Sequence, residues 1–364
     1  MGIFGKLSSS SKNNKNPYQE FWDWFNNHAQ EFYNIIKSGN QVEEKFINLF
    51  APELAKIEPH VFFLVGIEED KNAELIFTPD GRIQNVIWAE KLAASAPEIP
   101  NWKFRALKPA SNNINFAIRM HDLNFDKDNI MFFPVIHQDY PDKIDLMFVY
   151  EHYHVEAHDD IINGIFIFLD NFLGEETMIE SIDKIDVTGP QSTQEELIPL
   201  DKLRDYINWR EKEFVEKYQD VRHDPIEDQF TAFEGTIEGD KTILSTFNTS
   251  ILNWEHKASH PWILVIMINY EPENESGFPN SETYKSISNL EDDIENQLPG
   301  LDGYIFLGSE TVDGLRETFI ACREFRKVTE IIDQLLLKYA SQLNINYEFY
   351  KDKYWQSFER YQFN

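Results

Sequence analysis

The chain has 364 residues, and its 42% apolar and 14% aromatic content excludes a disordered chain and supplies material for hydrophobic cores. It carries 63 acidic against 33 basic residues, a net charge of −30 that is spread over both halves. This charge disfavours nucleic acid and anionic membranes as partners, and it favours a basic protein surface.

The N-terminus and the single cysteine bear on where the protein works. Residues 1–16 are rich in Ser, Asn and Lys and predict a flexible leader. This leader lacks the apolar core of a secretion signal, and no apolar run approaches the ~20 residues of a membrane helix. Cys322 excludes an intrachain disulfide and, in an apolar strand pattern, predicts a core role. We therefore expect a cytoplasmic protein that does not bind a membrane.

Residues 17–187 predict an N-terminal α+β domain, because the apolar period switches between that of a helix and that of a strand. Helical spacing is found at residues 18–37, 42–57, 82–95 and 161–173. Strand patterns are found at residues 60–67, 73–78, 102–107, 115–118, 130–135, 144–150 and 178–187. Gly and Pro residues separate these elements.

Residues 188–200 begin with Thr-Gly-Pro-Gln-Ser-Thr-Gln and predict a linker, so a C-terminal domain is expected at residues 201–364. From Trp262 the pattern predicts β-α-β-β-α-β, the ferredoxin-like arrangement, with both helices on one face of an antiparallel sheet. The fold class expected is therefore α+β, with two domains built on antiparallel sheets. The elements expected in this part are helices at 200–218, 281–298 and 325–343, and strands at 241–249, 262–268, 303–310, 315–322 and 345–350.

Short motifs in both halves resemble bacterial families. In the last third, an apolar strand at 262–268 is followed by the motifs Glu275–Pro279, Asp313–Glu317 and Asp352–Trp355. On these residues, the segment from Trp254 to Phe358 resembles the bacterial domain-of-unknown-function family six-nine-five.

The N-terminal half is similar to an unnamed bacterial family of unknown function. This likeness lies in two motifs, Ala93–Lys103 and Leu169–Glu175. Neither resemblance implies an activity or a catalytic set, so no site residue follows from them.

The segment 151–160, Glu-His-Tyr-His-Val-Glu-Ala-His-Asp-Asp, is the candidate for a metal site. His154 and His158 are four residues apart, which on a helix would place both rings on one face, as zinc requires. In the metalloprotease pattern a Glu follows the first His directly, whereas Val155 stands there. If His152 and His154 lie in a strand, those two rings share a face instead. We interpret the segment as a solvated loop without a metal, with a zinc site formed by these histidines as the alternative.

The remaining motifs of common enzymes are absent from the sequence. It has no Gly-x-Ser-x-Gly elbow, no phosphate loop and no dinucleotide fingerprint, so we expect no cofactor. These absences favour a non-enzymatic protein-interaction or regulatory module. The alternative is an enzyme, a hydrolase with its site near residues 151–160, and the sequence does not decide between the two.

Overall fold

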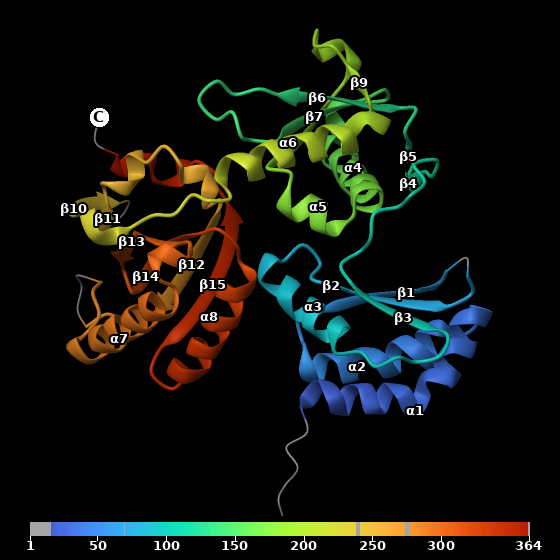
Figure 1. Cartoon of the computed structure of the whole chain (residues 1–364), viewed down its shortest axis with the longest axis horizontal. Coiled ribbons are helices and arrows are strands. Elements are labelled where there is room, and N and C mark those ends of the chain that lie inside the picture. The colour runs from blue at the N-terminus through green and yellow to red at the C-terminus, as the bar shows by residue number, and fades with distance from the viewer. Residues whose placement is uncertain (1–15, 69, 238–240, 274–276, 363–364) are drawn as a thin grey trace, which may run out of the picture. The chain divides into compact units, whose positions relative to one another are not determined.

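The computed structural model describes residues 16–68, 70–237, 241–273 and 277–362, which form an α+β protein with two compact units (Figure 1). The first unit comprises the described residues up to Asp80 together with Trp88–Leu107, and the second comprises Gly81–Ile87 and the described residues from Lys108 onward. The expected leader lies almost wholly outside the described residues, and the expected linker at 188–200 lies within the second unit. None of the described helices combines the length and the apolar character that crossing a bilayer requires.

The first unit contains a three-stranded sheet in the order β1-β2-β3. The strands β1 and β2 form an antiparallel hairpin, whereas β3 runs parallel to β2. The parallel pair differs from the all-antiparallel sheet expected here. The pair is parallel because the connection from β2 to β3 contains a helix and brings the chain back to the end of the sheet where β2 began. These elements are β1 (Phe62–Ile67), β2 (Ala73–Thr78), α3 (Val86–Ala94) and β3 (Trp102–Ala106).

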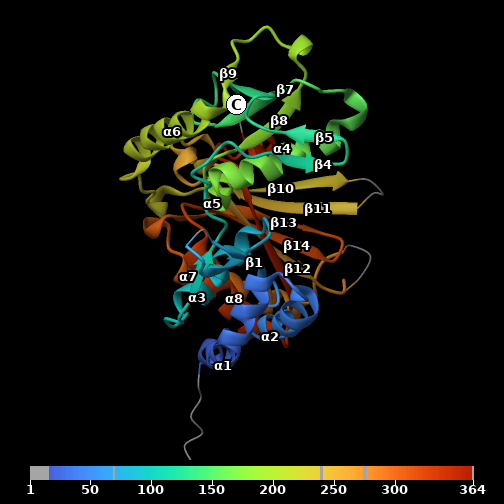
Figure 2. The same ribbon diagram turned by 90° about the vertical axis from the view of Figure 1, so that its right-hand side faces the viewer.

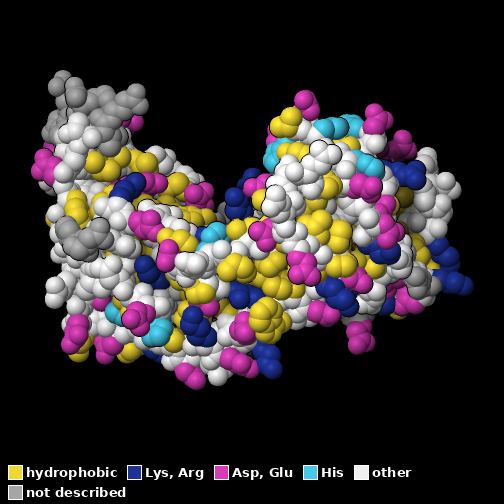
Figure 3. All heavy atoms as spheres, turned by 90° about the horizontal axis from the view of Figure 1, so that it is seen from above, with side chains coloured by type: hydrophobic (Ala, Val, Ile, Leu, Met, Phe, Trp, Pro, Cys, Tyr) yellow, Lys and Arg dark blue, Asp and Glu magenta, His cyan; other side chains and the backbone are white. Residues whose placement is uncertain are grey.

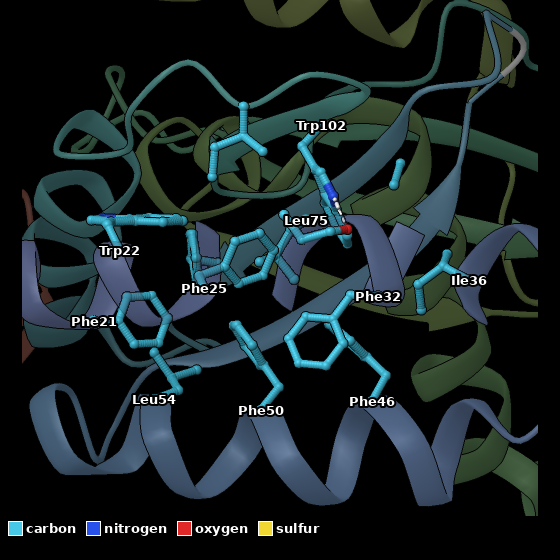
Figure 4. Packing of buried hydrophobic residues seen from close by; sticks show 14 of the residues in the cluster. Phe21, Trp22, Phe25, Phe32, Ile36, Phe46, Phe50, Leu54, Leu75 and Trp102 are labelled. Carbon is cyan, nitrogen blue, oxygen red and sulfur yellow. Dashed lines mark hydrogen bonds between the residues drawn. The ribbon is translucent and has the colours of Figure 1, made fainter. Parts of the chain in front are cut away.

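Aromatic side chains fill the core of the first unit (Figure 4). The helix α1 (Pro17–Ser38) begins where Asn16 accepts a hydrogen bond from the Tyr18 N–H, and it ends at Gly39, whose φ of 67° closes the last turn. A π-helical turn (Glu43–Ile47) leads into α2 (Asn48–Ile57). The indole of Trp102 donates to the Ala29 carbonyl at 3.0 Å, which satisfies its polar atom inside the core. The helices expected at 18–37 and 42–57 are therefore confirmed.

The first part of the second unit is a four-stranded sheet in the order β8-β7-β6-β9. The pair β7–β8 is parallel, and the other two pairs are antiparallel. The strand expected at 178–187 is wrong in its first part, because Gly174 ends α4 at a φ of 85° and a new short helix, α5, follows. These elements are β6 (Ile130–Val135), β7 (Asp145–Tyr150), α4 (His158–Leu173), α5 (Glu175–Glu180), β8 (Lys184–Thr188), β9 (Ile198–Pro199) and α6 (Leu203–Tyr218).

A short hairpin, β4 (Ile118–Met120) and β5 (Leu123–Phe125), covers α4 in this part of the second unit. The contact is close at Gly164, where a Cβ atom would lie 2.1 Å from the ring of Phe125. Glycine is therefore required at this position for the hairpin to pack against the helix.

The second part of this unit is a six-stranded antiparallel sheet in the order β10-β11-β13-β14-β12-β15, and Figure 2 shows its strands from β10 to β12 in succession. The sequence predicted every strand except β10, whose alternation is interrupted by Gly235. The strands are β10 (Phe230–Ile237), β11 (Lys241–Asn248), β12 (Trp262–Asn269), β13 (Tyr304–Val312), β14 (Leu315–Cys322) and β15 (Asn344–Lys351).

Helices α7 (Ser281–Gln297) and α8 (Arg326–Tyr339) lie side by side along this sheet (Figure 1). The opposite face is covered by a 3-10 helix, η10 (Gln356–Tyr361), whose Phe358 and Tyr361 enter the hydrophobic core. Tyr284 follows the helical spacing of the buried residues Ile287, Leu290 and Ile294 in α7, but its side chain is exposed.

Candidate functional site: a tryptophan–histidine pocket

A pocket of about 800 Å³ lies in the second unit, where β10 begins and β11 ends. Two short segments form its walls, one between α6 and β10 and the other directly after β11. Acidic side chains are frequent among the residues around it. The lining residues are His223, Asp224, Ile226, Glu227, Asp228, Gln229, Ser250, Ile251 and Trp254.

Local hydrogen bonds hold the first segment in a 3-10 turn (Pro225–Glu227). The side chain of Asp224 accepts from the Ile226 N–H at 3.1 Å, and Pro225 occupies the first position of the turn, where no N–H is needed. This cap leaves Ile226 and Glu227 exposed at the rim of the pocket.

The second segment is joined to the first through Ser250. Its Oγ accepts from the Gln229 N–H at 3.0 Å and donates to Asn248 Oδ1 at 2.7 Å. The hydroxyl proton of Ser250 is therefore directed at Asn248, so Ser250 is not arranged as a nucleophile activated by a histidine.

His223 and Asp228 form a pair at the inner part of the pocket. The distance from His223 Nε2 to Asp228 Oδ1 is 2.8 Å, and both side chains are mostly buried. The ring of Trp254 lies 5.5 Å from the His223 ring and 5.6 Å from the His256 ring. Because the carboxylate of Asp228 faces His223, this histidine adds little net positive charge to the pocket.

A third histidine, His260, lies 5.5 Å from the Trp254 ring and is fully buried. Burial lowers its pKa to about 3, and the charges of Arg323, His223 and Arg222 act in the same direction. The Ser259 hydroxyl donates to the His256 carbonyl at 2.6 Å, so it accepts from His260 Nδ1 at 2.8 Å. His260 is therefore neutral, with its proton on Nδ1; its Nε2 carries no proton and has no hydrogen-bond partner among the described residues.

Arg323 ties the end of α6 to the end of β14 beside the pocket. Its guanidinium donates to the carbonyl oxygens of Tyr218, Gln219 and Val221. The side chain of Arg323 passes over Gly303, whose φ is 102°. A Cβ atom added to Gly303 would lie 2.3 Å from the Arg323 side chain. These bonds keep the segment that carries His223 in place against the sheet.

A carboxylate that receives several donors joins the two parts of the second unit. Asp142 Oδ2 accepts from the hydroxyls of Tyr354 at 2.6 Å and Tyr218 at 2.7 Å, and from Lys217 Nζ at 2.9 Å. Although burial acts to raise the pKa of Asp142, these hydrogen bonds hold it below its usual value. Burial and the bond to Asp142 raise the pKa of both tyrosines.

A second buried carboxylate, Asp183, lies between two lysines. Its oxygens are 3.1 Å from Lys351 Nζ and 2.7 Å from Lys353 Nζ. Burial lowers the pKa of Lys351 to about 8. The pKa of Asp183 stays below its usual value, although its burial opposes this, because of the two lysine charges and the N–H of Ile144. The motif Asp352–Trp355, on which the resemblance partly rests, thus provides contacts to the preceding part of the chain.

The histidines predicted from the sequence lie elsewhere. His152 is in a turn beside the Tyr150 ring, His154 precedes a 3-10 turn, and His158 begins α4 with Nδ1 3.2 Å from the Tyr153 hydroxyl. The four-residue helical spacing assumed for His154 and His158 is therefore not formed. Among the described residues there is no group of three His, Cys, Asp or Glu side chains suited to a metal ion. A hydrolase site at 151–160 stays a prediction.

Cys322 lies at the end of β14 and is fully buried, which agrees with the core role expected for it. Burial raises the pKa of its thiol, so it is not an activated nucleophile. No sequence motif indicates the pocket, because His223, Asp228 and Trp254 meet only through the fold.

Comparison with known proteins supports the resemblance in the last third of the chain. No similar protein was found among curated proteins, and none among solved structures. No family matches the N-terminal half. The pocket spans the start of the matched region, since His223 and Asp228 precede it and Trp254 lies within it. Residues 229–362 match the sequence model of a family of unknown function (DUF695).

Proposed function

We propose that this chain is a non-enzymatic, protein-binding module of the cytoplasm, whose pocket at Trp254 receives a cationic side chain of a basic partner protein. The observation that carries this proposal is the composition of the pocket, whose lining combines the carboxylates of Asp224 and Glu227 with the indole of Trp254. His223, the basic residue among those that line it, already faces Asp228.

The chemistry of this lining suits lysine or arginine. A cation over a tryptophan face gains roughly 0.5–2 kcal/mol, depending on how far it is desolvated. Carboxylates at the rim add charge-assisted hydrogen bonds to the same cation. Ile226, 85% exposed beside Glu227, offers an apolar contact to the aliphatic stem of such a side chain.

The charge of the whole chain favours the same class of partner. Figure 3 shows acidic side chains scattered over one face of the molecule, with Lys and Arg among them. With a net charge of −30, the field accelerates encounter with a basic surface, and this acceleration weakens as salt rises.

The sheet provides a rigid support for the pocket. We interpret β12 to β15, with α7 and α8, as a ferredoxin-like unit that the hairpin β10–β11 extends. The strand order β13-β14-β12-β15 and the antiparallel pairing support this interpretation. Binding residues on loops that such a scaffold positions are a common arrangement in proteins.

A charge reversal at the rim tests the proposal. Glu227→Lys is compared with Glu196→Lys, which makes the same change at an exposed residue that does not line the pocket. The probe is a set of fluorescent Gly/Ser peptides that contain one Lys, one Arg or one norleucine, with affinity followed by anisotropy at 50 and 500 mM salt.

We expect binding of the Lys or Arg peptides to be at least tenfold weaker for Glu227→Lys and nearly unchanged for Glu196→Lys. Binding should also weaken at high salt. Equal binding of the norleucine peptide, or equal effects of the two substitutions, would show that the pocket does not recognise a cation.

A further inference from the structure

The strand β1 forms an edge of the sheet in the first unit, and among the described strands it pairs only with β2. Its residues, Phe-Phe-Leu-Val-Gly-Ile, include no charge and no proline, and its ladder with β2 runs without a bulge. Proteins usually protect an edge strand with a charged residue, a proline or a bulge, because an unprotected edge can pair with a strand of another chain. The edge of β1 carries none of them.

The hydrogen bonds of β2 show which groups of β1 point outward. The Ala73 N–H bonds to Asn101, and the Phe77 carbonyl accepts from Leu107, so these β2 residues face β3. Because the direction alternates along a strand, Glu74, Ile76 and Thr78 face β1 and pair with Gly66, Leu64 and Phe62.

The residues of β1 between these pairs, Phe63, Val65 and Ile67, therefore direct their N–H and carbonyl groups away from β2. In the described part of the chain, these groups make no backbone bond to another element. The N–H and carbonyl groups of these three alternate residues are thus available to pair with a strand of another chain.

The side chains on one face of β1 are exposed as well. Phe62 is 50% and Leu64 is 45% exposed, and Gly66 follows on the same face. Phe63 and Val65 point to the opposite face and pack against the core of the first unit. An added strand would therefore cover apolar surface without disturbing that core.

We propose that β1 of a second copy of this chain pairs antiparallel with this edge, with Leu64 opposite Leu64 about a two-fold axis. A two-fold perpendicular to the sheet keeps the exposed faces of both copies on the same side, which requires pairs of this kind. Phe62 then lies opposite Gly66 of the second copy, and Phe63 opposite Val65.

This register covers the side chains of β1 better than the registers centred on Val65 or on Phe63 would. The ring of Phe62 covers the space that Gly66 leaves, and Phe63 and Val65 exchange the outward hydrogen bonds. A pair centred on Val65 would leave Phe62 without a partner, and one centred on Phe63 would leave Gly66 uncovered.

Charge restricts where two copies can meet. Two chains of net charge −30 repel each other, so they can meet only where few acidic groups oppose one another. The uncharged strand β1 is such a place, and the two-fold makes its pattern self-complementary. The contact is small, so we expect a reversible dimer that forms in the micromolar range.

Sedimentation velocity of the full chain over a range of concentrations tests the association. Leu64→Lys places two ammonium groups opposite each other and should shift the chain to monomer, with at least a tenfold weaker dimer. Leu49→Lys adds the same charge at an exposed position of α2 and should leave the dimer unchanged. Far-ultraviolet circular dichroism checks that both variants are folded.

Disulfide trapping tests the register. Opposed residues without mutual hydrogen bonds have Cα atoms about 4.5 Å apart, a separation that a disulfide can bridge. Leu64→Cys should therefore form a covalent dimer under mild oxidation, whereas Phe62→Cys, on the same face, should not. A wild-type chain that stays monomeric at several hundred micromolar, or equal trapping at both positions, would overturn the proposal.

Discussion

Lys353 Nζ lies 2.7 Å from Asp183 Oδ2, and the two side chains are only 5% and 9% exposed. Lys351 reaches the other oxygen of the same carboxylate and also donates to the Glu180 carbonyl at 2.6 Å. This buried arrangement joins the end of β15 to the segment before β8. Removing the shared carboxylate would leave two cations buried without their partner, which is far more costly than losing an exposed ion pair.

Asp183→Asn should accordingly lower the free energy of unfolding by about 3–5 kcal/mol. Asp186→Asn is the matched control, since Asp186 pairs with Lys184 at 3.5 Å, where the lysine is exposed and the aspartate is half-buried; it should cost less than about 1 kcal/mol. Urea denaturation followed by tryptophan fluorescence measures both values. Similar losses for the two variants would mean that the buried arrangement contributes no special stability.

Tyr218→Phe and Tyr354→Phe each remove one hydroxyl donor from Asp142. A hydrogen bond to a charged acceptor contributes about 1.5–3 kcal/mol, so each variant should be destabilised by an amount in that range. Since both hydroxyls bind the same oxygen, the double variant should depart from the sum of the single ones. A double-mutant cycle by urea denaturation measures this coupling, and strict additivity would contradict it.

His260 should make the stability of the protein depend on pH. Its pKa is about 3 when folded and about 6.5 when unfolded. Between these values only the unfolded state binds the proton, so this group lowers the unfolding free energy by up to about 1.4 kcal/mol for each unit that the pH falls. The contribution is absent above pH 6.5.

His260→Gln should reduce this slope by about one proton between pH 6 and pH 4, whereas His154→Gln, at an exposed residue, should not. Urea denaturation midpoints measured at several pH values provide the slopes. An unchanged slope in His260→Gln would show that the histidine is already protonated in the folded protein.

The histidines at 151–160 should not bind a metal tightly. His152, His154 and His158 lie on a turn, before a 3-10 turn and at the start of α4, so no single element presents them together. Elemental analysis of protein purified without a metal-affinity tag should find no stoichiometric zinc. Zinc at one atom per chain that His158→Ala removes would contradict this expectation.

Much of the secondary structure could be predicted from apolar spacing. The stripe of α1 and the alternation in β12 recur over enough residues for local pattern to decide the element. Other elements escaped this reasoning. The short helix α5 depends on the positive φ of Gly174, and β10 has too weak an alternation and exists because β11 offers it a partner.

By itself, the sequence determined the α+β class, the net negative charge and the match of residues 229–362 to a family of unknown function, since composition, local periodicity and short motifs carry this information. The tertiary structure alone decided the division into units, the parallel strand pairs and both polar sites. The pocket joins His223 to Trp254, and Asp183 pairs with Lys351 and Lys353, across long separations in the chain. Such contacts depend on how strands pair and chain segments return, which no local pattern specifies.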